Sequence, residues 1–197
     1  MALQNKIYNH FSDTIAVIQD AQTNLSELIE VASLRLVTAL LNDKKILTCG
    51  KGSSGICAQM FSSAMLNQFE RVRPSLPSIS LAADSVTLTA ITNDYQFDDI
   101  FAKQIRALGQ SGDLLIIYTD GRNATNIAKA ITAAHDKGIA VIGVTGKDDV
   151  MMESLLNDFD IAIEIPTNSG ARILEGQLLI SHCWLDLIDH QLFGGNI

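Results

Sequence analysis

Apolar residues near the start of the chain recur at helical spacing. Successive members of the first stripe are three or four residues apart, which places them on one face of a helix. Ser26 is of the type that caps a helix N-terminus, and a second apolar stripe begins at Leu28. The pattern therefore predicts two consecutive helices within residues 1–41. The first stripe comprises Ile7, Phe11, Ile15 and Ile18.

Short apolar runs of strand length follow, and segments with helical character separate them. The clearest run is Leu-Leu-Ile-Ile-Tyr at 114–118. Strands that alternate with helices in this way form a parallel sheet covered on both faces. We expect a single α/β domain with a five-stranded parallel sheet, an N-terminal helical extension over 1–41 and an α/β core over 42–197. The five expected strands are 45–49, 78–81, 114–118, 139–144 and 161–165.

A long apolar helix is expected over 171–193. Its apolar positions, which include Leu178, Trp184 and Leu192, cover more than one face of the helix. One sheet cannot cover that much apolar surface. We therefore expect a homo-oligomer that packs through its helices.

The composition describes a folded, acidic protein. Of the 197 residues, 47% are hydrophobic and 18% are charged, which excludes a disordered chain. The formal net charge of −8 argues against nucleic acid and anionic membranes as direct partners. The three cysteines lack CxxC spacing, and we find neither a signal peptide nor an apolar stretch of the ~18 residues that a membrane span needs. These features favour a cytoplasmic protein with reduced thiols.

A turn rich in glycine and serine follows the first strand. Ligands of parallel sheets bind beyond the carboxyl ends of the strands. Backbone amides, serine hydroxyls and the start of a helix suit an anion, and Lys51 adds a positive charge. The turn matches neither the dinucleotide-binding glycine pattern nor a P-loop, and a tight turn without a ligand is the alternative. Its candidate ligand-binding residues are Lys51, Gly52, Ser53 and Ser54.

A second turn follows the strand at 114–118. Asp120 would oppose a phosphate there, because two like unit charges ~4 Å apart repel by roughly 1 kcal/mol in water and about 4 kcal/mol at an effective dielectric constant near 20. Arg122 offsets this charge if its side chain points inward, but not if it points into solvent, and the sequence leaves both orientations open. The candidate ligand-binding residues of this turn are Thr119, Asp120, Arg122 and Asn123.

Three other chemistries have less support in the sequence. His182, Asp186 and His190 recur every four residues on one helix and offer metal ligands, although a solvated helix face is the simpler explanation. No G-x-S-x-G pattern supports a serine hydrolase. Cys57 lies near a helix N-terminus, which lowers the pKa of a thiol, but buried packing is the favoured interpretation.

Motifs spread along the whole chain resemble those of the sugar isomerase (SIS) domain, and more narrowly those of the phosphoheptose isomerase family. They are a C-G-x-G-x-S turn, an R-P-x-x-P segment, an N-D pair, a G-D pair before a strand and R-I-x-E on the last helix. The resemblance implies a five-stranded parallel sheet, a homotetramer and a sugar-phosphate site at subunit junctions. It adds the N-D pair, Asn93 and Asp94, to the candidate ligand-binding residues.

The resemblance also shows which catalytic groups the chain lacks. Family isomerases move a proton between adjacent carbons with a His and a Glu that lie four residues apart on the helix after the first turn. In this chain Met60 and Ala64 occupy these two positions, and Leu174 occupies the position of a family Gln on the last helix. None of the three binds zinc through nitrogen or oxygen, so we expect no metal cofactor. His182 keeps the family residue type and is the residual catalytic candidate. The three serines of the family's second turn are also replaced.

Within this family the chain resembles the DnaA initiator-associating branch, whose members are tetramers that bind the bacterial replication initiator. Leu192 and Phe193 correspond to a Leu-Phe pair that contributes to the partner surface of that branch. An exposed pair would anchor a partner, whereas packing of the helix end onto a neighbouring subunit is the alternative. On this resemblance we expect a tetrameric regulator of replication initiation that binds the initiator protein, and the missing catalytic groups favour a non-enzymatic role.

Two alternatives stay open beside this expectation. An active isomerase would convert sedoheptulose 7-phosphate for lipopolysaccharide heptose biosynthesis, with residual groups such as His182 and Asp94. A regulatory sensor would instead bind a sugar phosphate without reacting it. Turnover of sedoheptulose 7-phosphate separates these possibilities, and a sugar phosphate that binds would raise thermal stability. The sensor would use Lys51, Ser53, Ser54 and Arg122 as ligands.

Overall fold

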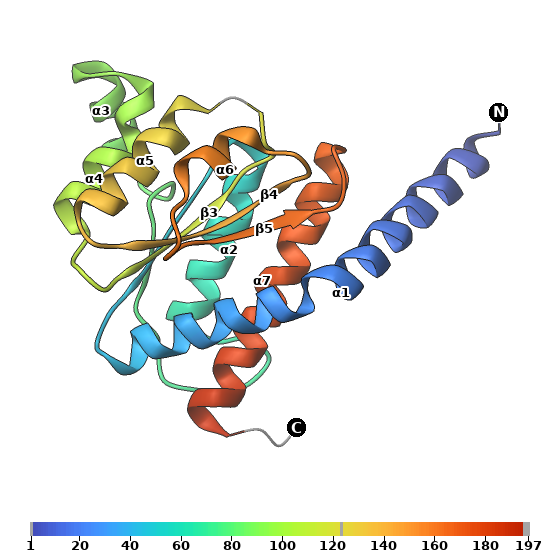
Figure 1. The fold of residues 1–197 in the computed structure, drawn as a ribbon, viewed down its shortest axis with the longest axis horizontal. Coiled ribbons are helices and arrows are strands. Elements are labelled where there is room, and N and C mark those ends of the chain that lie inside the picture. The colour runs from blue at the N-terminus through green and yellow to red at the C-terminus, as the bar shows by residue number, and fades with distance from the viewer. Residues whose placement is uncertain (1, 123, 195–197) are drawn as a thin grey trace.

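One parallel sheet organises the computed structural model, which describes residues 2–122 and 124–194 (Figure 1). The strand order is β2-β1-β3-β4-β5, and all neighbouring strands are parallel. β3 is central and is buried at all five positions, as expected for a strand covered on both faces. The strands are β1 (Ile46–Gly50), β2 (Ser78–Ser80), β3 (Leu114–Tyr118), β4 (Ala140–Gly146) and β5 (Ile161–Ile165).

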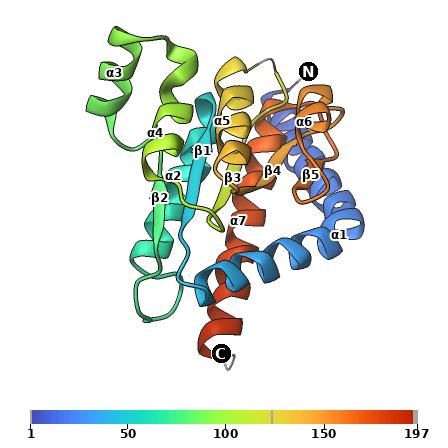
Figure 2. The same cartoon turned by 60° about the vertical axis from the view of Figure 1, so that its left-hand side comes forward.

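Seven α-helices are found in the described part of the chain, and they cover both faces of the sheet (Figures 1 and 2). Helices α1, α2 and α7 pack on one face, and α3 to α6 pack on the other. Short 3₁₀ turns, η1 (Gly52–Ser54) and η2 (Phe97–Asp99), precede α2 and α4. Within residues 2–122 and 124–194, none of the helices combines the length and the apolar character that crossing a bilayer requires. The helices are α1 (Leu3–Leu41), α2 (Gly55–Leu66), α3 (Ser85–Asp94), α4 (Ile100–Leu108), α5 (Thr125–Asp136), α6 (Val150–Leu155) and α7 (Gly170–Phe193).

Each face of the sheet has its own apolar core. Beside α1, α2 and α7, the Trp184 ring meets Phe61 edge-on, with ring centroids 6.4 Å apart. On the opposite face, Phe101 and Ile105 of α4 pack with Ile127 of α5. Complete burial of a side chain of this size contributes about 1.5–3 kcal/mol. Both cores therefore hold the strands, and with them the strand ends, in defined positions.

The fold class predicted from the sequence is confirmed, with one correction. The single α/β domain, the five-stranded parallel sheet and the long C-terminal helix are all present. The prediction of two N-terminal helices is wrong, because α1 is continuous from Leu3 to Leu41. Ser26 does not cap a helix, since its Oγ donates to the Gln22 carbonyl oxygen at 2.5 Å within α1. No glycine or proline interrupts residues 3–41 to break the helix.

The first part of α1 projects away from the sheet (Figure 1). Arg172, buried near the start of α7, fixes the direction of this projection. Its Nη1 donates to the His10 carbonyl oxygen and to Thr14 Oγ1, each at 2.6 Å, and its Nη2 pairs with Glu175 at 2.7 Å. On the projecting part the large side chains of Ile7 and Phe11 are exposed. A single chain therefore leaves an apolar stripe of α1 uncovered.

Candidate functional site

The two turns predicted to bind a ligand lie side by side at the carboxyl ends of β1 and β3. These strands are adjacent, and Gly50 at the end of β1 is in register with Tyr118 at the end of β3. The backbone N–H of Lys51 also donates to the Tyr118 carbonyl oxygen at 3.1 Å. The fold therefore brings the first turn (51–54) and the second turn (119–122) to one edge of the sheet, where parallel sheets bind ligands.

The shape of the first turn depends on glycine. A Cβ atom at Gly50 would lie 2.6 Å from the Ser54 carbonyl oxygen, so only glycine allows this close return of the chain. Gly52 has a φ of +54°, in the left-handed region that side chains disfavour. Ser54 is buried, whereas Gly52 and Ser53 are exposed. The exposed residues Gly52 and Ser53 thus lie just before the N-terminal end of α2, a position that favours anions.

The second turn is closed by an ion pair. Arg122 Nε donates to Asp120 Oδ2 at 2.7 Å, and Nη2 of Arg122 contacts the same oxygen. Burial opposes ionisation of Asp120, but hydrogen bonds and charge from Arg122, aided by the charge of Lys51, outweigh it and lower the pKa of this carboxyl. The Arg122 side chain is 78% exposed. It therefore folds back onto Asp120 at the surface, which settles the orientation that the sequence left open.

Lys51 connects the two turns. Its Nζ donates to the Arg122 carbonyl oxygen at 3.0 Å, so a side chain of the first turn supports the backbone of the second. Lys51, Asp120 and Arg122 together carry a formal charge of +1. The combination of this positive charge with exposed amides at the first turn suits a phosphate group.

Helix α7 is hydrogen-bonded to the second turn through a buried side chain. Gln177 is fully buried, and its Nε2 donates to the Thr119 carbonyl oxygen at 2.7 Å and to the Val144 carbonyl oxygen at 3.1 Å. One turn further along α7, Ser181 Oγ is 2.8 Å from the Tyr118 hydroxyl. The sequence interpretation did not include Gln177. Its signal was a pair of polar residues, Gln177 and Ser181, four positions apart and so on one face of the helix.

The positions given to catalysis by the family resemblance lie on α2 and α7, beside the apolar core. Met60, Ala64 and Leu174 are half-buried and pack against the core. Among the described residues no group of three or more His, Cys, Asp or Glu side chains could hold a metal ion. A thioether, a methyl group and an isobutyl group do not fit a zinc ion that needs nitrogen, oxygen or thiolate ligands. These three side chains therefore cannot hold a zinc ion.

His182 is separated from the two turns. Its ring stacks on Phe69, with centroids 5.5 Å apart. Phe69 follows the C-terminal end of α2, and the first turn precedes the N-terminal end of this helix. A 12-residue helix is about 18 Å long. One chain thus does not bring His182 to the phosphate-binding turns.

The remaining candidate residues are dispersed. Asn93 and Asp94 are exposed at the end of α3, where Asn93 Nδ2 donates to Asp94 Oδ1 at 2.8 Å. Asp186 and His190 are exposed on α7. Asn123 lies outside the described residues.

The Leu-Phe pair at the end of α7 is packed against its own chain. Leu192 contacts the apolar core, and the guanidinium carbon of Arg71 lies 5.9 Å from the centre of the Phe193 ring. Arg71 also donates to the Phe193 carbonyl oxygen at 3.2 Å. Both side chains are half-buried. The exposed anchor considered from the sequence is therefore not what the structure shows.

Two of the three cysteines, Cys49 and Cys57, are buried, and Cys183 is half-buried. Burial raises the pKa of Cys57 to about 11 and raises that of Cys49 further. Neither position has a neighbouring cation that would stabilise a thiolate in the described structure. The packing interpretation of Cys57 agrees with this environment.

A five-stranded parallel sheet covered by helices on both faces defines an α/β domain, and comparison with known proteins identifies its family. The chain belongs to the SIS-domain family, whose model matches residues 9–146, and within it to the phosphoheptose isomerase family. The phosphoheptose isomerase of Methylococcus capsulatus is 49% identical over 189 residues, which cover 96% of this chain and 97% of the relative. That of Chromohalobacter salexigens is 48% identical, with 98% of each chain covered.

Solved structures show the same relationship. A phosphoheptose isomerase from Francisella tularensis matches with a TM-score of 0.92 and 40% identity over 96% of this chain and all of that chain. Phosphoheptose isomerase GmhA from Neisseria gonorrhoeae matches with a TM-score of 0.89 and 38% identity over 95% of this chain and 99% of that chain.

These findings correct the function expected from the sequence. Four curated relatives at 45–49% identity over nearly the whole chain are named phosphoheptose isomerase, not initiator-associating proteins. They overturn the expectation of a replication-initiation regulator and favour the isomerase alternative. The expectation gave too much weight to a few side chains, chiefly Met60, Ala64 and Leu174, and too little to the agreement along the rest of the chain.

Proposed function

We propose that this protein binds the phosphate of a seven-carbon sugar at its two strand-end turns and interconverts the ketose and aldose forms, with sedoheptulose 7-phosphate as the ketose. The observation that carries this proposal is the 45–49% identity over at least 95% of the chain to proteins named phosphoheptose isomerase. The paired turns at the carboxyl ends of β1 and β3 support it, because they supply amides and positive charge for the phosphate.

Each turn has a distinct part in binding. The exposed amides and Ser53 of the first turn would contact phosphate oxygens directly. Lys51 would add charge while holding the second turn through the Arg122 carbonyl oxygen. Because Arg122 already pairs with Asp120, its guanidinium would divide its charge between that carboxylate and the phosphate.

The reaction moves protons and needs no oxidant. A proton leaves carbon 1 of the ketose to give an enediol, and a proton returns to carbon 2 to give the aldose. The hydroxyl proton moves from oxygen 1 to oxygen 2. A general acid or base contributes about 10²–10⁴-fold to such a transfer. The candidates in this chain are His182 and Asp94.

These candidates lie on separate elements, so we also propose that a homotetramer assembles the site at its subunit junctions. The exposed apolar stripe at the start of α1 supports association between chains. A junction would allow His182 of one chain and the turns of another to face the same substrate.

A second function is favoured by the apolar side chains at these positions of α2 and α7. Met60, Ala64 and Leu174 offer no group for proton transfer, and a protein of this kind would bind a sugar phosphate as a sensor without converting it. Both functions use the same phosphate-binding turns, and they differ only in turnover.

Turnover and binding measured together separate the two functions. Conversion of sedoheptulose 7-phosphate should be followed by NMR spectroscopy with added zinc and with a chelator, and binding by thermal shift. Conversion that His182→Ala abolishes and His190→Ala preserves supports the isomerase. A thermal shift without conversion supports the sensor, and neither conversion nor a shift contradicts both.

A further inference from the structure

The second strand-end turn already uses its own hydrogen-bond donors. The backbone N–H of Gly121 donates to Thr119 Oγ1 at 3.4 Å, and that of Arg122 donates to Asp120 Oδ1 at 3.3 Å. Backbone N–H groups of a turn are donors that commonly bind an anion. In this turn, side chains of the turn itself accept both of them.

The Asp120 carboxylate also takes the guanidinium of Arg122. Its Oδ2 accepts from Arg122 Nε at 2.7 Å and contacts Nη2 of the same group. The two oxygens of one carboxylate therefore receive three N–H groups of a single residue. Phosphate groups are recognised by the same combination of a guanidinium fork and backbone amides. Asp120 thus occupies an anion position, although it belongs to the protein itself.

Lys51 makes this position part of the proposed phosphate site. Its Nζ donates to the Arg122 carbonyl oxygen at 3.0 Å, so the first turn contacts the residue that Asp120 holds. The Arg122 side chain is 78% exposed, and the Asp120 side chain is 17% exposed. An incoming anion can therefore reach the guanidinium from solvent, while most of the Asp120 side chain is covered.

Counting Asp149, the formal charges around the second turn cancel. Lys51 and Arg122 carry two positive charges, and Asp120 and Asp149 carry two negative charges. Asp149 is buried beside the turn, since a Cβ atom at Gly121 would lie 3.6 Å from Asp149 Cβ. Its oxygens accept hydrogen bonds at 2.6 and 3.1 Å from residues of β4 and α6, which hold it in place. Asp120 is therefore the carboxylate of this pair that can give way to a phosphate.

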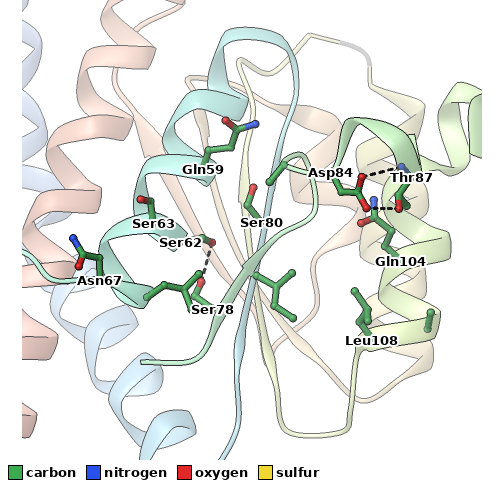
Figure 3. A pocket seen from close by; sticks show the side chains of 14 residues that line it. Gln59, Ser62, Ser63, Asn67, Ser78, Ser80, Asp84, Thr87, Gln104 and Leu108 are labelled. Carbon is green, nitrogen blue, oxygen red and sulfur yellow. Dashed lines mark hydrogen bonds between the residues drawn. The ribbon is translucent and has the colours of Figure 1, made fainter. Parts of the chain in front are cut away.

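A groove beside the edge strand β2 is a poorer match for a phosphate (Figure 3). Among the described residues, its lining contains no Lys, Arg or His. Asp84 lies in this lining and accepts from the Thr87 N–H at 3.1 Å and from the Thr87 hydroxyl at 2.5 Å. A phosphate would meet a carboxylate there with no cation to offset the repulsion. The strand-end turns offer the better-matched donors.

We propose that Asp120 is an internal competitor of the ligand phosphate. In the free protein its carboxylate occupies the guanidinium and the amide of Arg122, and a phosphate binds there by displacing it. The competition concerns the phosphate of the proposed sugar ligand and so rests on the proposed function. A ligand that also contacts the protein through its sugar offsets the cost of this displacement, whereas inorganic phosphate does not.

The test compares phosphate binding by variants of the full-length protein. Asp120→Asn keeps the shape of the side chain and removes its charge. Asp43→Asn removes the same charge from the turn before β1, at the opposite edge of the sheet, and its φ of +57° is one that asparagine adopts readily. Dissociation constants for inorganic phosphate and sedoheptulose 7-phosphate would be measured by isothermal titration calorimetry at pH 8 and constant ionic strength.

We expect Asp120→Asn to bind both ligands at least about fivefold more tightly than the wild type, the effect of one pair of like charges ~4 Å apart in water. Asp43→Asn should change the affinity less than about twofold, because the five residues of β1 separate it from the site by about 16 Å, beyond the screening length of ~10 Å. In an Arg122→Ala background the gain from Asp120→Asn should shrink, because no guanidinium is released. If Asp120 served only to shape the turn, its replacement would weaken binding instead.

Unchanged or weaker binding by Asp120→Asn would overturn the proposal, and so would an equal gain in Asp43→Asn. Failure of Asp120→Asn to bind either ligand would do the same. Asp120→Ser also removes the charge, and it replaces Asp120→Asn in the comparison if circular dichroism shows that Asp120→Asn does not fold.

A separate assay of sedoheptulose 7-phosphate conversion distinguishes this competition from the proposed reaction. Tighter binding by Asp120→Asn without conversion by any variant supports the competition and contradicts the isomerase. Conversion by the wild type without tighter binding by Asp120→Asn supports the isomerase and contradicts the competition.

Discussion

Arg73 shows how one buried residue joins segments that are far apart in the sequence. Its Nε donates to Asp189 Oδ1 at 2.6 Å, and its Nη groups donate to the carbonyl oxygens of Ala64, Met65 and Pro74. The side chains of Arg73 and Asp189 are only 1% and 3% exposed. Loss of the arginine would leave the carboxylate buried without a counter-ion. We expect Arg73→Ala to lower the free energy of unfolding by about 3–5 kcal/mol, measured by urea titration.

A matched variant controls for the loss of one positive charge. Arg106→Ala on the exposed side of α4 should change the free energy of unfolding by less than about 0.5 kcal/mol. Arg73→Lys keeps the charge but not the planar fork, and an intermediate loss is expected. An Arg73→Ala protein as stable as Arg106→Ala would show that the buried ion pair contributes nothing.

The thiols provide a second prediction at this scale. Burial raises the pKa of Cys57 from 9.0 to about 11, and it raises that of Cys183 together with the charge of Asp186. Each pKa unit lowers the thiolate fraction about tenfold, so Cys57 should react roughly a hundredfold more slowly with iodoacetamide at pH 8 than in the unfolded chain. Mass spectrometry of peptides after timed alkylation measures this rate. Rapid labelling of Cys57 in the folded protein would restore the reactive-thiol interpretation.

At the scale of elements, the turn after β1 depends on a glycine that cannot be replaced. A methyl group at Gly50 would meet the backbone of Ser54 and Gly55 at 2.6–2.8 Å, and neither contact can move aside without opening the turn. We expect Gly50→Ala to destabilise the protein by about 1–3 kcal/mol and to abolish the thermal shift produced by a sugar phosphate.

Gly170→Ala is the appropriate comparison. It lies at the start of α7, its nearest neighbour is Arg122 Nη2 at 3.6 Å, and its φ is not in the left-handed region. Alanine there should be neutral or stabilising because it favours the helix. If Gly170→Ala lost as much binding as Gly50→Ala, the loss could not be attributed to the shape of the first turn.

Most helices and strands could be predicted from the sequence. The strands Leu114–Tyr118 and Ile161–Ile165 match the predicted ranges, because each is a short, largely apolar run between polar or glycine-rich segments. The break expected before Leu28 is absent, because a serine can bond within a helix as well as cap one. The local pattern therefore predicted which segments are helices and strands, but it did not predict whether two adjacent helical segments form one continuous helix.

The sequence predicted where the candidate site lies, but it did not predict the side-chain contacts within the site. Both turns follow strands and contain glycine, so their positions were available from the sequence. The pairing of Arg122 with Asp120 depends on side-chain orientation, and the support from Gln177 depends on how α7 crosses β3 and β4. Such contacts form between segments distant in sequence, and local spacing carries no information about them.

At the scale of the whole molecule, the hydrogen bonds of Arg172 fix the direction of the apolar stripe of α1. Arg172 holds α1 at His10 and Thr14, so the helix leaves the body in a fixed direction. The projecting stripe is therefore presented rigidly to other chains, which reduces the entropy lost on association. The sequence suggested association through helices, and the structure adds which part of which helix is uncovered.

This arrangement makes the oligomeric state sensitive to one position. Ile7, Phe11 and Ile15 are 57%, 67% and 55% exposed in a single chain. If the stripe packs against another copy, a carboxylate at its centre would be buried without a partner. We expect Phe11→Glu to shift the proposed tetramer to smaller species at micromolar concentration, as measured by light scattering after size-exclusion chromatography. Asn9→Glu adds the same charge on the opposite face of α1 and should leave the assembly intact.

Because the proposed active site spans subunit junctions, Phe11→Glu should lose turnover together with assembly. Full turnover by a monomeric Phe11→Glu protein would place all the catalytic groups within one chain.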